Sequence, residues 1–231
     1  MQEWIETASS GLPVHRLGNG DARAGVVIVS EIWGVDTNLR SWAARFVAEG
    51  YTVAMPDLWW RAGGPPALSN AEEVSASVER FDDGHALRDV AAAAASLPRG
   101  LPRVVVGFCL GGLYARLASS AVPGLAAAVE FYGRIVYPTL SAAKPAQPLD
   151  LLPGRACPLL CHFGGLDSIA PPHHVDELER KLAGQPQPGR VFRYPGVGHA
   201  FMNASRAGWN AAAAESAWRR TLRFLDEALP G

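Results

Sequence analysis

Short apolar runs alternate with helical patterns along the chain from Gly25 onward. Between the runs, apolar residues recur at helical spacing over 39–47 and 87–97, and again along a long last helix expected to begin after Ser205. This alternation predicts an α/β fold with a mostly parallel central sheet and helices on both faces. The runs with the length and unbroken hydrophobicity of buried strands are 26–29, 51–55, 104–106, 127–131, 158–162 and 191–194.

Length and charge narrow the classes of protein to be considered. A chain of 231 residues, 48% hydrophobic, is long enough for one large core, so a single domain over residues 1–231 is expected. Its 21 basic and 22 acidic residues nearly cancel and form no basic stripe, which argues against nucleic acid or a membrane surface as partner. No secretory signal pattern and no apolar stretch of ~20 residues is present, so a cytoplasmic protein is expected.

Three cysteines, Cys109, Cys157 and Cys161, form an odd and sparse set that a secreted disulfide framework would not use. They are therefore expected to be reduced thiols. Cys157 and Cys161 share one predicted strand and would lie about 13 Å apart at ~3.3 Å per residue, too far to bind one metal ion together. No metal site is predicted.

The stretch 104–112, VVVGFCLGG, runs from a predicted strand through Gly-x-Cys-x-Gly into a helix. Glycines on both sides leave room for a nucleophile elbow, a tight strand-to-helix turn that places the central side chain at a helix N-terminus. The helix dipole there favours a thiolate, so Cys109 is the candidate nucleophile, and the backbone N–H of Leu110 would point at a substrate oxygen. The competing interpretation is a buried structural cysteine.

Two later loops offer an acid and a base in the chain order that this fold uses. Asp167 follows a predicted strand in a glycine-rich turn and would orient a histidine, although an aspartate in such a turn can also merely cap the next helix. His199 lies on a glycine-rich loop after the last predicted strand and can reach the nucleophile as general base. His162, within a strand, is expected to be a satisfied core residue instead.

Several motifs together resemble the dienelactone hydrolase family, and they occur in family order over essentially the whole chain. Glu31 stands at the end of the first predicted core strand, in the loop from which the second oxyanion N–H should come. The motifs are SEIWGV at 30–35, PDLW at 56–59, GFCLGG at 107–112, FYG at 131–133, GGLD at 164–167 and GHAF at 198–201.

The resemblance implies an α/β-hydrolase fold and hydrolysis of a small ester or lactone, with no metal or organic cofactor. It implies that Glu31 contacts the resting Cys109 and takes its proton when substrate arrives. It also implies that the backbone N–H groups of Ile32 and Leu110 form the oxyanion hole. A small-molecule substrate is thus the expected partner, and the oligomeric state is not predicted.

The sequence departs from the family pattern at the substrate carboxylate. Members that open dienelactones hold it with two arginines, one of them four residues after the catalytic histidine, where this chain has Asn203. Losing such contacts would forfeit ~1.5–3 kcal/mol per charged hydrogen bond, which argues against an anionic dienelactone unless Arg80, Arg134 or Arg206 substitutes. The residues predicted to contact substrate are Trp33, Trp59, Trp60, Tyr132, Phe201 and Asn203.

Alternative functions remain open at this point. The same residues would serve a thioesterase or an aryl esterase. A catalytically idle scaffold that binds a small ligand is a third possibility, since a fold alone does not give a function. Cys109 as a redox sensor is a fourth, without a resolving cysteine nearby in the sequence.

Overall fold

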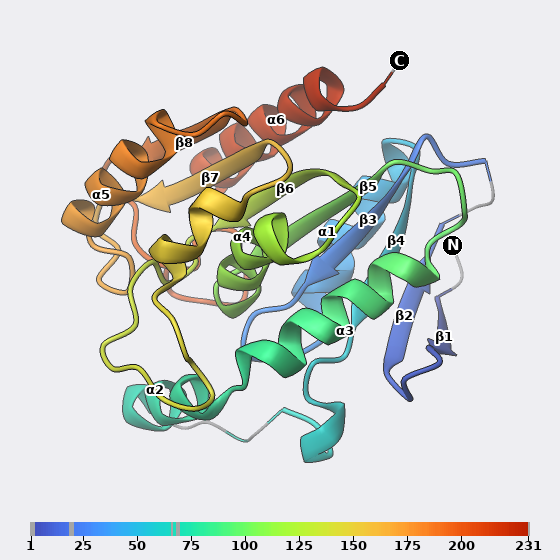
Figure 1. The fold of residues 1–231 in the computed structure, drawn as a ribbon, viewed down its shortest axis with the longest axis horizontal. Coiled ribbons are helices and arrows are strands. Elements are labelled where there is room, and N and C mark those ends of the chain that lie inside the picture. Colours follow the sequence, from blue (N-terminus) through green and yellow to red (C-terminus); the bar gives the residue numbers. More distant parts are fainter. Residues whose placement is uncertain (1–2, 19–20, 66, 68–69, 231) are drawn as a thin grey trace.

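A computed structural model describes residues 3–18, 21–65, 67 and 70–230, and places them around one eight-stranded sheet (Figure 1). The strands are β1 (Trp4–Thr7), β2 (Pro13–Leu17), β3 (Ala24–Val29), β4 (Tyr51–Pro56), β5 (Arg103–Phe108), β6 (Leu125–Phe131), β7 (Leu159–Gly164) and β8 (Gly189–Tyr194). The helices are α1 (Thr37–Ala48), α2 (Ala71–Arg80), α3 (Asp83–Ser96), α4 (Leu110–Ala121), α5 (Pro172–Ala183) and α6 (Ala211–Ala228), with 3₁₀ turns η1 (Trp60–Ala62) and η2 (Pro148–Gly154).

The sheet order is β1-β2-β4-β3-β5-β6-β7-β8, and every pairing from β4 to β8 is parallel. Only β1 and β2, which pair antiparallel at one edge, break the pattern. The predicted mostly parallel sheet of an α/β hydrolase is confirmed. Because all central strands run the same way, the loops that leave their carboxyl ends gather at one edge of the sheet.

Both faces of the sheet are covered, which explains why its strands read as unbroken apolar runs. In β3, Val27 and Val29 face the core under α3, α4 and α5, whereas Val26 and Ile28 face the core under α1 and α6. Figure 1 shows α3 in front of the sheet and α1 behind it. Burial of each such side chain contributes roughly 1.5–3 kcal/mol, so the strand is held by its residues on both faces.

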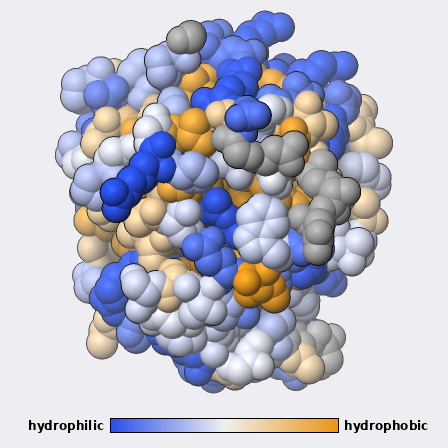
Figure 2. Space-filling model, turned by 90° about the vertical axis from the view of Figure 1, so that its right-hand side faces the viewer, coloured by the Kyte–Doolittle hydropathy of each residue, from blue (hydrophilic) through white to orange (hydrophobic). Residues whose placement is uncertain are grey.

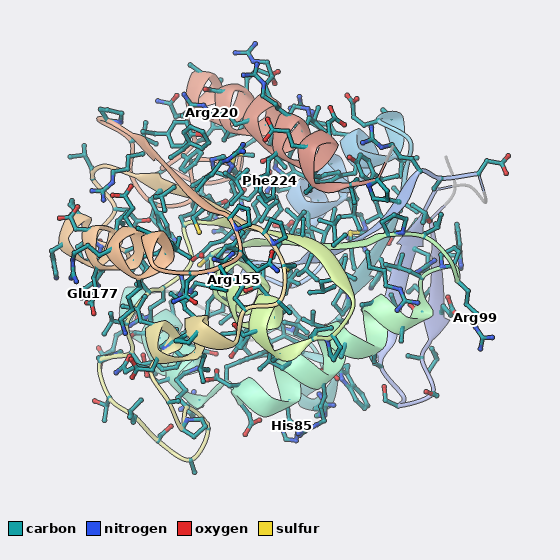
Figure 3. The ribbon with its side chains drawn as sticks, turned by 45° about the horizontal axis from the view of Figure 1, so that its top comes forward. His85, Arg99, Arg155, Glu177, Arg220 and Phe224 are labelled. Atoms are coloured by element: carbon teal, nitrogen blue, oxygen red, sulfur yellow. The ribbon has the colours of Figure 1, made fainter. Side chains whose placement is uncertain are left out.

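The last helix begins at Ala211, later than the predicted start after Ser205. The intervening residues form a series of turns that follow His199, and the side chain of Asn210 then caps the helix by accepting from the N–H of Ala213. Phe224 packs from α6 toward the sheet, while Arg220 lies over the ring of Phe192 at 4.3 Å (Figure 3). The helix is thus pinned over β7 and β8.

The hairpin of β1 and β2 was not predicted. Its outer strand is exposed along its whole length, with Trp4 and Ile5 45% and 62% exposed, so it lacks the buried pattern that reveals the other strands. Figure 2 shows this side of the molecule, where hydrophobic surface occurs as separate spots among hydrophilic side chains. Within the described ranges, no helix is both long and apolar enough to cross a membrane.

Candidate active site

The turn between β5 and α4 places Cys109 at the N-terminus of α4 in an uncommon backbone conformation, φ 53° and ψ −113°. Two glycines make the turn possible. A Cβ on Gly107 would lie 1.8 Å from the carbonyl oxygen of Gly111, and one on Gly111 would lie 2.1 Å from that of Val29. The N–H of Cys109 donates to the carbonyl of Phe131 at 3.0 Å, which anchors the turn to β6. Strain of this kind, of order 1–3 kcal/mol, concentrates at functional sites.

The three residues predicted to cooperate lie together at the carboxyl edge of the sheet. Nε2 of His199 is 3.1 Å from Sγ of Cys109, and Nδ1 of the same ring is 2.8 Å from Oδ2 of Asp167. They come from the loops after β5, β7 and β8 and are separated by up to 90 residues in the chain. The ring is therefore held between a carboxylate and a thiol, the arrangement required of a base that serves a nucleophile.

Asp167 bonds both to the turn that follows it and to His199, but it does not cap α5, whose N-cap is Pro171. Its Oδ1 accepts from the backbone N–H groups of Ile169 at 2.8 Å and Ala170 at 3.2 Å, so it caps the turn before α5. Its Oδ2 remains available to His199. The side chain is buried, and the turn bonds fix the carboxylate in the orientation that holds the imidazole.

The environment of His199 favours its charged form. Burial by itself would lower the pKa of the imidazole, but the negative charge of a Cys109 thiolate and the hydrogen bonds to Asp167 and Cys109 raise it well above its usual range. An imidazolium beside a thiolate is the ion pair that activates a cysteine nucleophile. The geometry thus supports proton transfer from sulfur to Nε2.

The competing histidines lie elsewhere. His162 is buried between Tyr194 and Thr221, at 2.9 and 3.2 Å, and burial lowers its pKa to about 3, so it stays neutral in the core. His85 lies on the outer side of α3 (Figure 3). His15 sits 2.7 Å from Glu3 near the β1 edge. None of them borders the cavity at Cys109.

Glu31 is buried at the end of β3 and holds two donors. The hydroxyl of Tyr132 donates to Oε1 at 2.9 Å, and Nδ2 of Asn203 donates to Oε2 at 2.6 Å. Burial raises the pKa of Glu31, an effect that both hydrogen bonds and the nearby His199 oppose. Among the described residues no hydrogen bond joins Glu31 to Cys109, the contact that the family resemblance implies for the resting site.

A cavity of about 320 Å³ opens onto the sulfur of Cys109. Glu31 and His199 border it beside the nucleophile, as do Ile32 and Leu110, the two residues predicted to supply oxyanion N–H groups. Most of its remaining wall is apolar. The other lining residues are Trp33, Val74, Ser75, Val78, Leu113, Arg134, Ile169, Ala200 and Arg206.

Residues 16–229 match the sequence profile of the Dienelactone hydrolase family. The chain belongs to this family. It is 31% identical over 207 residues to a candidate carboxymethylenebutenolidase of Escherichia coli O157:H7, covering 87% of this chain and 76% of that protein. A candidate 2-oxo-3-(5-oxofuran-2-ylidene)propanoate lactonase of Bradyrhizobium sp is 32% identical over 205 residues, covering 87% and 82%.

The crystal structure of a candidate dienelactone hydrolase from Klebsiella pneumoniae superposes with a TM-score of 0.88 at 25% identity, covering 97% of each chain. The family resemblance predicted from the motifs is thereby confirmed. As a member of the dienelactone hydrolase family, the protein is a hydrolase of the ester and lactone type, and its partner is a small molecule.

Of the residues predicted to contact substrate, only Trp33 lines the cavity. Trp59 packs edge-on against Phe81, with ring centroids 4.9 Å apart, and Trp60 donates from its indole to Asp89. Both rings lie away from the cavity, since Phe81 lies between α2 and α3 and Asp89 lies on α3. The remaining predicted residues, Tyr132, Phe201 and Asn203, are fully buried and do not line the cavity.

Two of the three arginines considered as substitutes reach the cavity. The Arg206 guanidinium lies 3.7 Å from the centroid of the Trp33 ring, and its Nε is buried without a hydrogen-bond partner. Arg134 borders the same cavity and pairs with Glu79 at 3.6 Å. Arg80 instead borders a separate, more polar hollow beside η1. Cationic groups are thus present at the cavity, although not at the family positions.

Helix α2 forms a wall of the cavity, which was not predicted from the sequence. Val74 and Val78 face the cavity from one side of this helix, and Ile169 faces it from the loop after β7. The spacing of the two valines, four residues apart in an otherwise polar segment, is the signal of a helix with one narrow apolar stripe. Within the described residues, no three His, Cys, Asp or Glu side chains are grouped so that they could hold a metal ion.

Proposed function

We propose that the protein hydrolyses a small ester or enol lactone through a cysteinyl acyl-enzyme, with Cys109 as nucleophile, His199 as general base and Asp167 as the orienting acid. The observation that supports this most strongly is the continuous chain of contacts from Oδ2 of Asp167 through the imidazole to Sγ, which ends at a cavity. Glu31 belongs to the same proposed catalytic set.

The first half of the reaction transfers the acyl group to sulfur. The thiol passes its proton to Nε2 of His199, and the thiolate attacks the carbonyl carbon to form a C–S bond. The carbonyl oxygen becomes an oxyanion that accepts from the N–H groups of Ile32 and Leu110. As the C–O bond of the ester breaks, the imidazolium returns its proton to the leaving oxygen, which in a lactone stays tethered to the acyl group.

The second half regenerates the enzyme. His199 removes a proton from a water molecule, whose oxygen attacks the thioester carbon and forms a C–O bond. The C–S bond then breaks, the sulfur recovers a proton from the imidazolium, and the carboxylic acid product leaves. Asp167 holds the imidazole in the tautomer that both halves require and stabilises its charged form.

The cavity favours a small and mostly apolar substrate. Its volume of about 320 Å³ is at the low end of the range of about 300–1,000 Å³ found for small-molecule sites. Ile32, Val74, Val78 and Leu113 provide an apolar wall. Arg206, stacked on Trp33, offers a donor group to any carboxylate that the substrate carries.

We also propose that the protein acts in the cytoplasm. The described residues contain Cys109, Cys157 and Cys161 as free thiols, and a thiol nucleophile has to stay reduced to act. The cytosol is the compartment that keeps thiols in that state.

Turnover of p-nitrophenyl esters of graded acyl length, enol lactones and thioesters, followed by acid quench and mass spectrometry, tests the mechanism directly. The expected result is hydrolysis of short esters or lactones with the acyl mass attached to the peptide that contains Cys109. Turnover without any adduct on that peptide contradicts the acyl-enzyme, and a preference for thioesters favours the alternative thioesterase function.

Paired esters that differ only in a terminal carboxylate test the role of Arg206. In Arg206→Ala we expect KM for the carboxylated ester to rise about 10-fold, since a charged hydrogen bond is worth roughly 1.5–3 kcal/mol, while KM for the neutral partner changes little. An equal rise for both esters would show that Arg206 supports the Trp33 wall and does not bind a carboxylate.

A further inference from the structure

Asn203 occupies a buried position directly behind the catalytic groups. Its backbone N–H donates to the carbonyl of Ala200 at 2.9 Å, and its Oδ1 accepts from the N–H of Ser205 at 2.9 Å, so it closes the turn that follows His199. Its Nδ2 points away from that turn and donates to Oε2 of Glu31 at 2.6 Å. One side chain therefore joins the β8 loop to the β3 loop.

Glu31 is held from two sides by this bond and by Tyr132. The Tyr132 hydroxyl donates to the other carboxylate oxygen at 2.9 Å, and its ring lies edge-on to the imidazole of His199 with centroids 5.0 Å apart. Beyond these two donors, the charged or titratable groups that act on the carboxylate are His199 and Asp36. Both oxygens thus have partners, and neither partner is the thiol.

The partner of Cys109 in the resting site is His199, at 3.1 Å. A carboxylate that approached the sulfur would accept from the S–H group and repel a thiolate, and both effects keep the sulfur protonated. A carboxylate held at a distance does neither. The location of Glu31 therefore influences whether the thiol can give its proton to the imidazole.

We propose that Asn203 is a positioning residue that holds Glu31 off Cys109, so that in the resting enzyme the thiol exchanges its proton with His199 alone. This inference rests on the proposed function, in which Cys109 is the nucleophile. An amide suits the task because it donates a hydrogen bond to the carboxylate without adding a charge beside the imidazole. Cys109 should consequently be reactive before any substrate binds.

Asn203→Asp tests the bond with little change of shape. The new side chain keeps an oxygen for the N–H of Ser205, but it replaces the donor to Glu31 with a second oxygen. Two ionised carboxylates so close repel each other, so Glu31 loses its tether and is released toward Cys109. We expect alkylation of Cys109 by iodoacetamide at pH 6.5, without substrate, to slow about tenfold, and kcat to fall while KM stays nearly constant.

A reciprocal exchange separates positioning from general loosening of the turn. In the double variant Glu31→Gln with Asn203→Asp, the new amide can donate to the new carboxylate, which rebuilds the bond with its direction reversed. The double variant should alkylate at least as fast as Glu31→Gln alone. A defect of Asn203→Asp that persists in full beside Glu31→Gln would overturn the proposal, as would wild-type alkylation by Asn203→Asp.

Two further variants complete the test. Asn38→Ala removes a different bond to the same turn, which the N–H of Ala204 donates to Oδ1 of Asn38 at 3.2 Å, and should alkylate at the wild-type rate. Asn203→Leu deletes the donor without adding charge and should also slow alkylation. Cys157 and Cys161 are buried, and mass spectrometry of the Cys109 peptide excludes their contribution.

The outcomes distinguish this inference from the proposed function. If the proposed function fails, Cys109→Ala keeps its hydrolytic activity whatever Asn203 does. If only the positioning role fails, Cys109→Ala is inactive while Asn203→Asp and Asn203→Leu both alkylate and turn over like the wild type.

Discussion

Among the described residues, a cysteine, a histidine and a carboxylate lie close together in two places, and only in one of them does the histidine contact both partners. At the carboxyl edge of the sheet, His199 contacts both Cys109 and Asp167. In the middle of the sheet, Cys161 and His162 are neighbours in β7, and Glu130 lies beside Cys161 on β6. The same residue types therefore occur in both places with different connections.

The middle set is divided by the sheet itself. Successive strand residues point to opposite faces, so Cys161 packs on the side of α4, whereas His162 stacks on Phe131 and bonds to Thr221 of α6. Burial raises the pKa of the Cys161 thiol well above its usual range and lowers that of His162 to about 3. Both groups stay neutral, and they face opposite sides of the sheet.

Glu130 in the middle set is also committed to a structural partner. Arg116 of α4, fully buried, pairs with it, and the Cys161 thiol donates to its other oxygen at 3.5 Å. Burial raises the pKa of Glu130 to about 7, although Arg116 opposes the rise. Strand positions fix such groups in the core, whereas the loops at the sheet edge leave Cys109 and His199 free to meet each other and a substrate.

The largest expected difference between the two sets concerns the thiols. Cys109→Ala should lower ester hydrolysis by at least ~10³-fold with the protein still folded, because the nucleophile is lost and only binding and oxyanion effects remain. Cys161→Ala should keep kcat and lose about 1–2 kcal/mol of unfolding free energy from the cavity and the lost donor to Glu130. Initial rates and urea unfolding measure both. Equal losses of activity in Cys109→Ala and Cys161→Ala would contradict the assignment of Cys109 as the nucleophile.

The two histidines should differ in the same direction by a smaller factor. His199→Ala is expected to lower kcat by at least ~10²-fold, the low end of what a positioned general base contributes. His162→Gln should leave kcat within about 3-fold and lower the unfolding free energy by about 1–3 kcal/mol, since its bonds to Tyr194 and Thr221 are disturbed. A large loss of kcat in His162→Gln with normal stability would show that His162, and not His199, is the general base.

A third difference between the two histidines is expected in the pH dependence of stability. The pKa of His162 is about 3 in the folded protein, whereas that of an unfolded histidine is about 6.5. On acidification the unfolded chain therefore binds a proton that the folded chain does not bind. The stability that neutral His162 provides is present above the unfolded pKa and is lost as pH falls from about 6.5 toward 3. The slope from this group reaches up to about 1.4 kcal/mol per pH unit.

His162→Gln should therefore flatten the fall of the unfolding free energy between pH 6 and pH 4. His199 has the opposite sign, because its raised pKa adds stability at low pH that is lost as pH rises through the folded value. Urea titrations of the wild type, His162→Gln and His199→Ala, at half-unit steps of pH, measure how the unfolding free energy changes with pH. Parallel curves for the wild type and His162→Gln would show that the core histidine does not set the acid limit.

Most of the parallel sheet was predictable because its strands are buried on both faces and its turns are marked by glycine. The elbow at Cys109 was predictable for the same reason, since Gly107 and Gly111 tolerate contacts that no side chain could. The β1–β2 hairpin was not, because an exposed edge strand needs no apolar pattern. The start of α6 was placed too early because the turn at Asn203 depends on its distant partner Glu31, and because the local cap at Asn210, which accepts from the N–H of Ala213, was overlooked.

The sequence by itself determined which residues could do the chemistry and in which order they reach the sheet edge, because strand, glycine turn and helix are local patterns. Only the tertiary structure decided what each side chain touches. Glu31 accepts hydrogen bonds from Asn203 and Tyr132. Trp59 and Trp60 lie away from the cavity, whereas Arg134, Arg206 and α2 line it. Such contacts join residues far apart in the chain, so packing sets them and no local pattern records them.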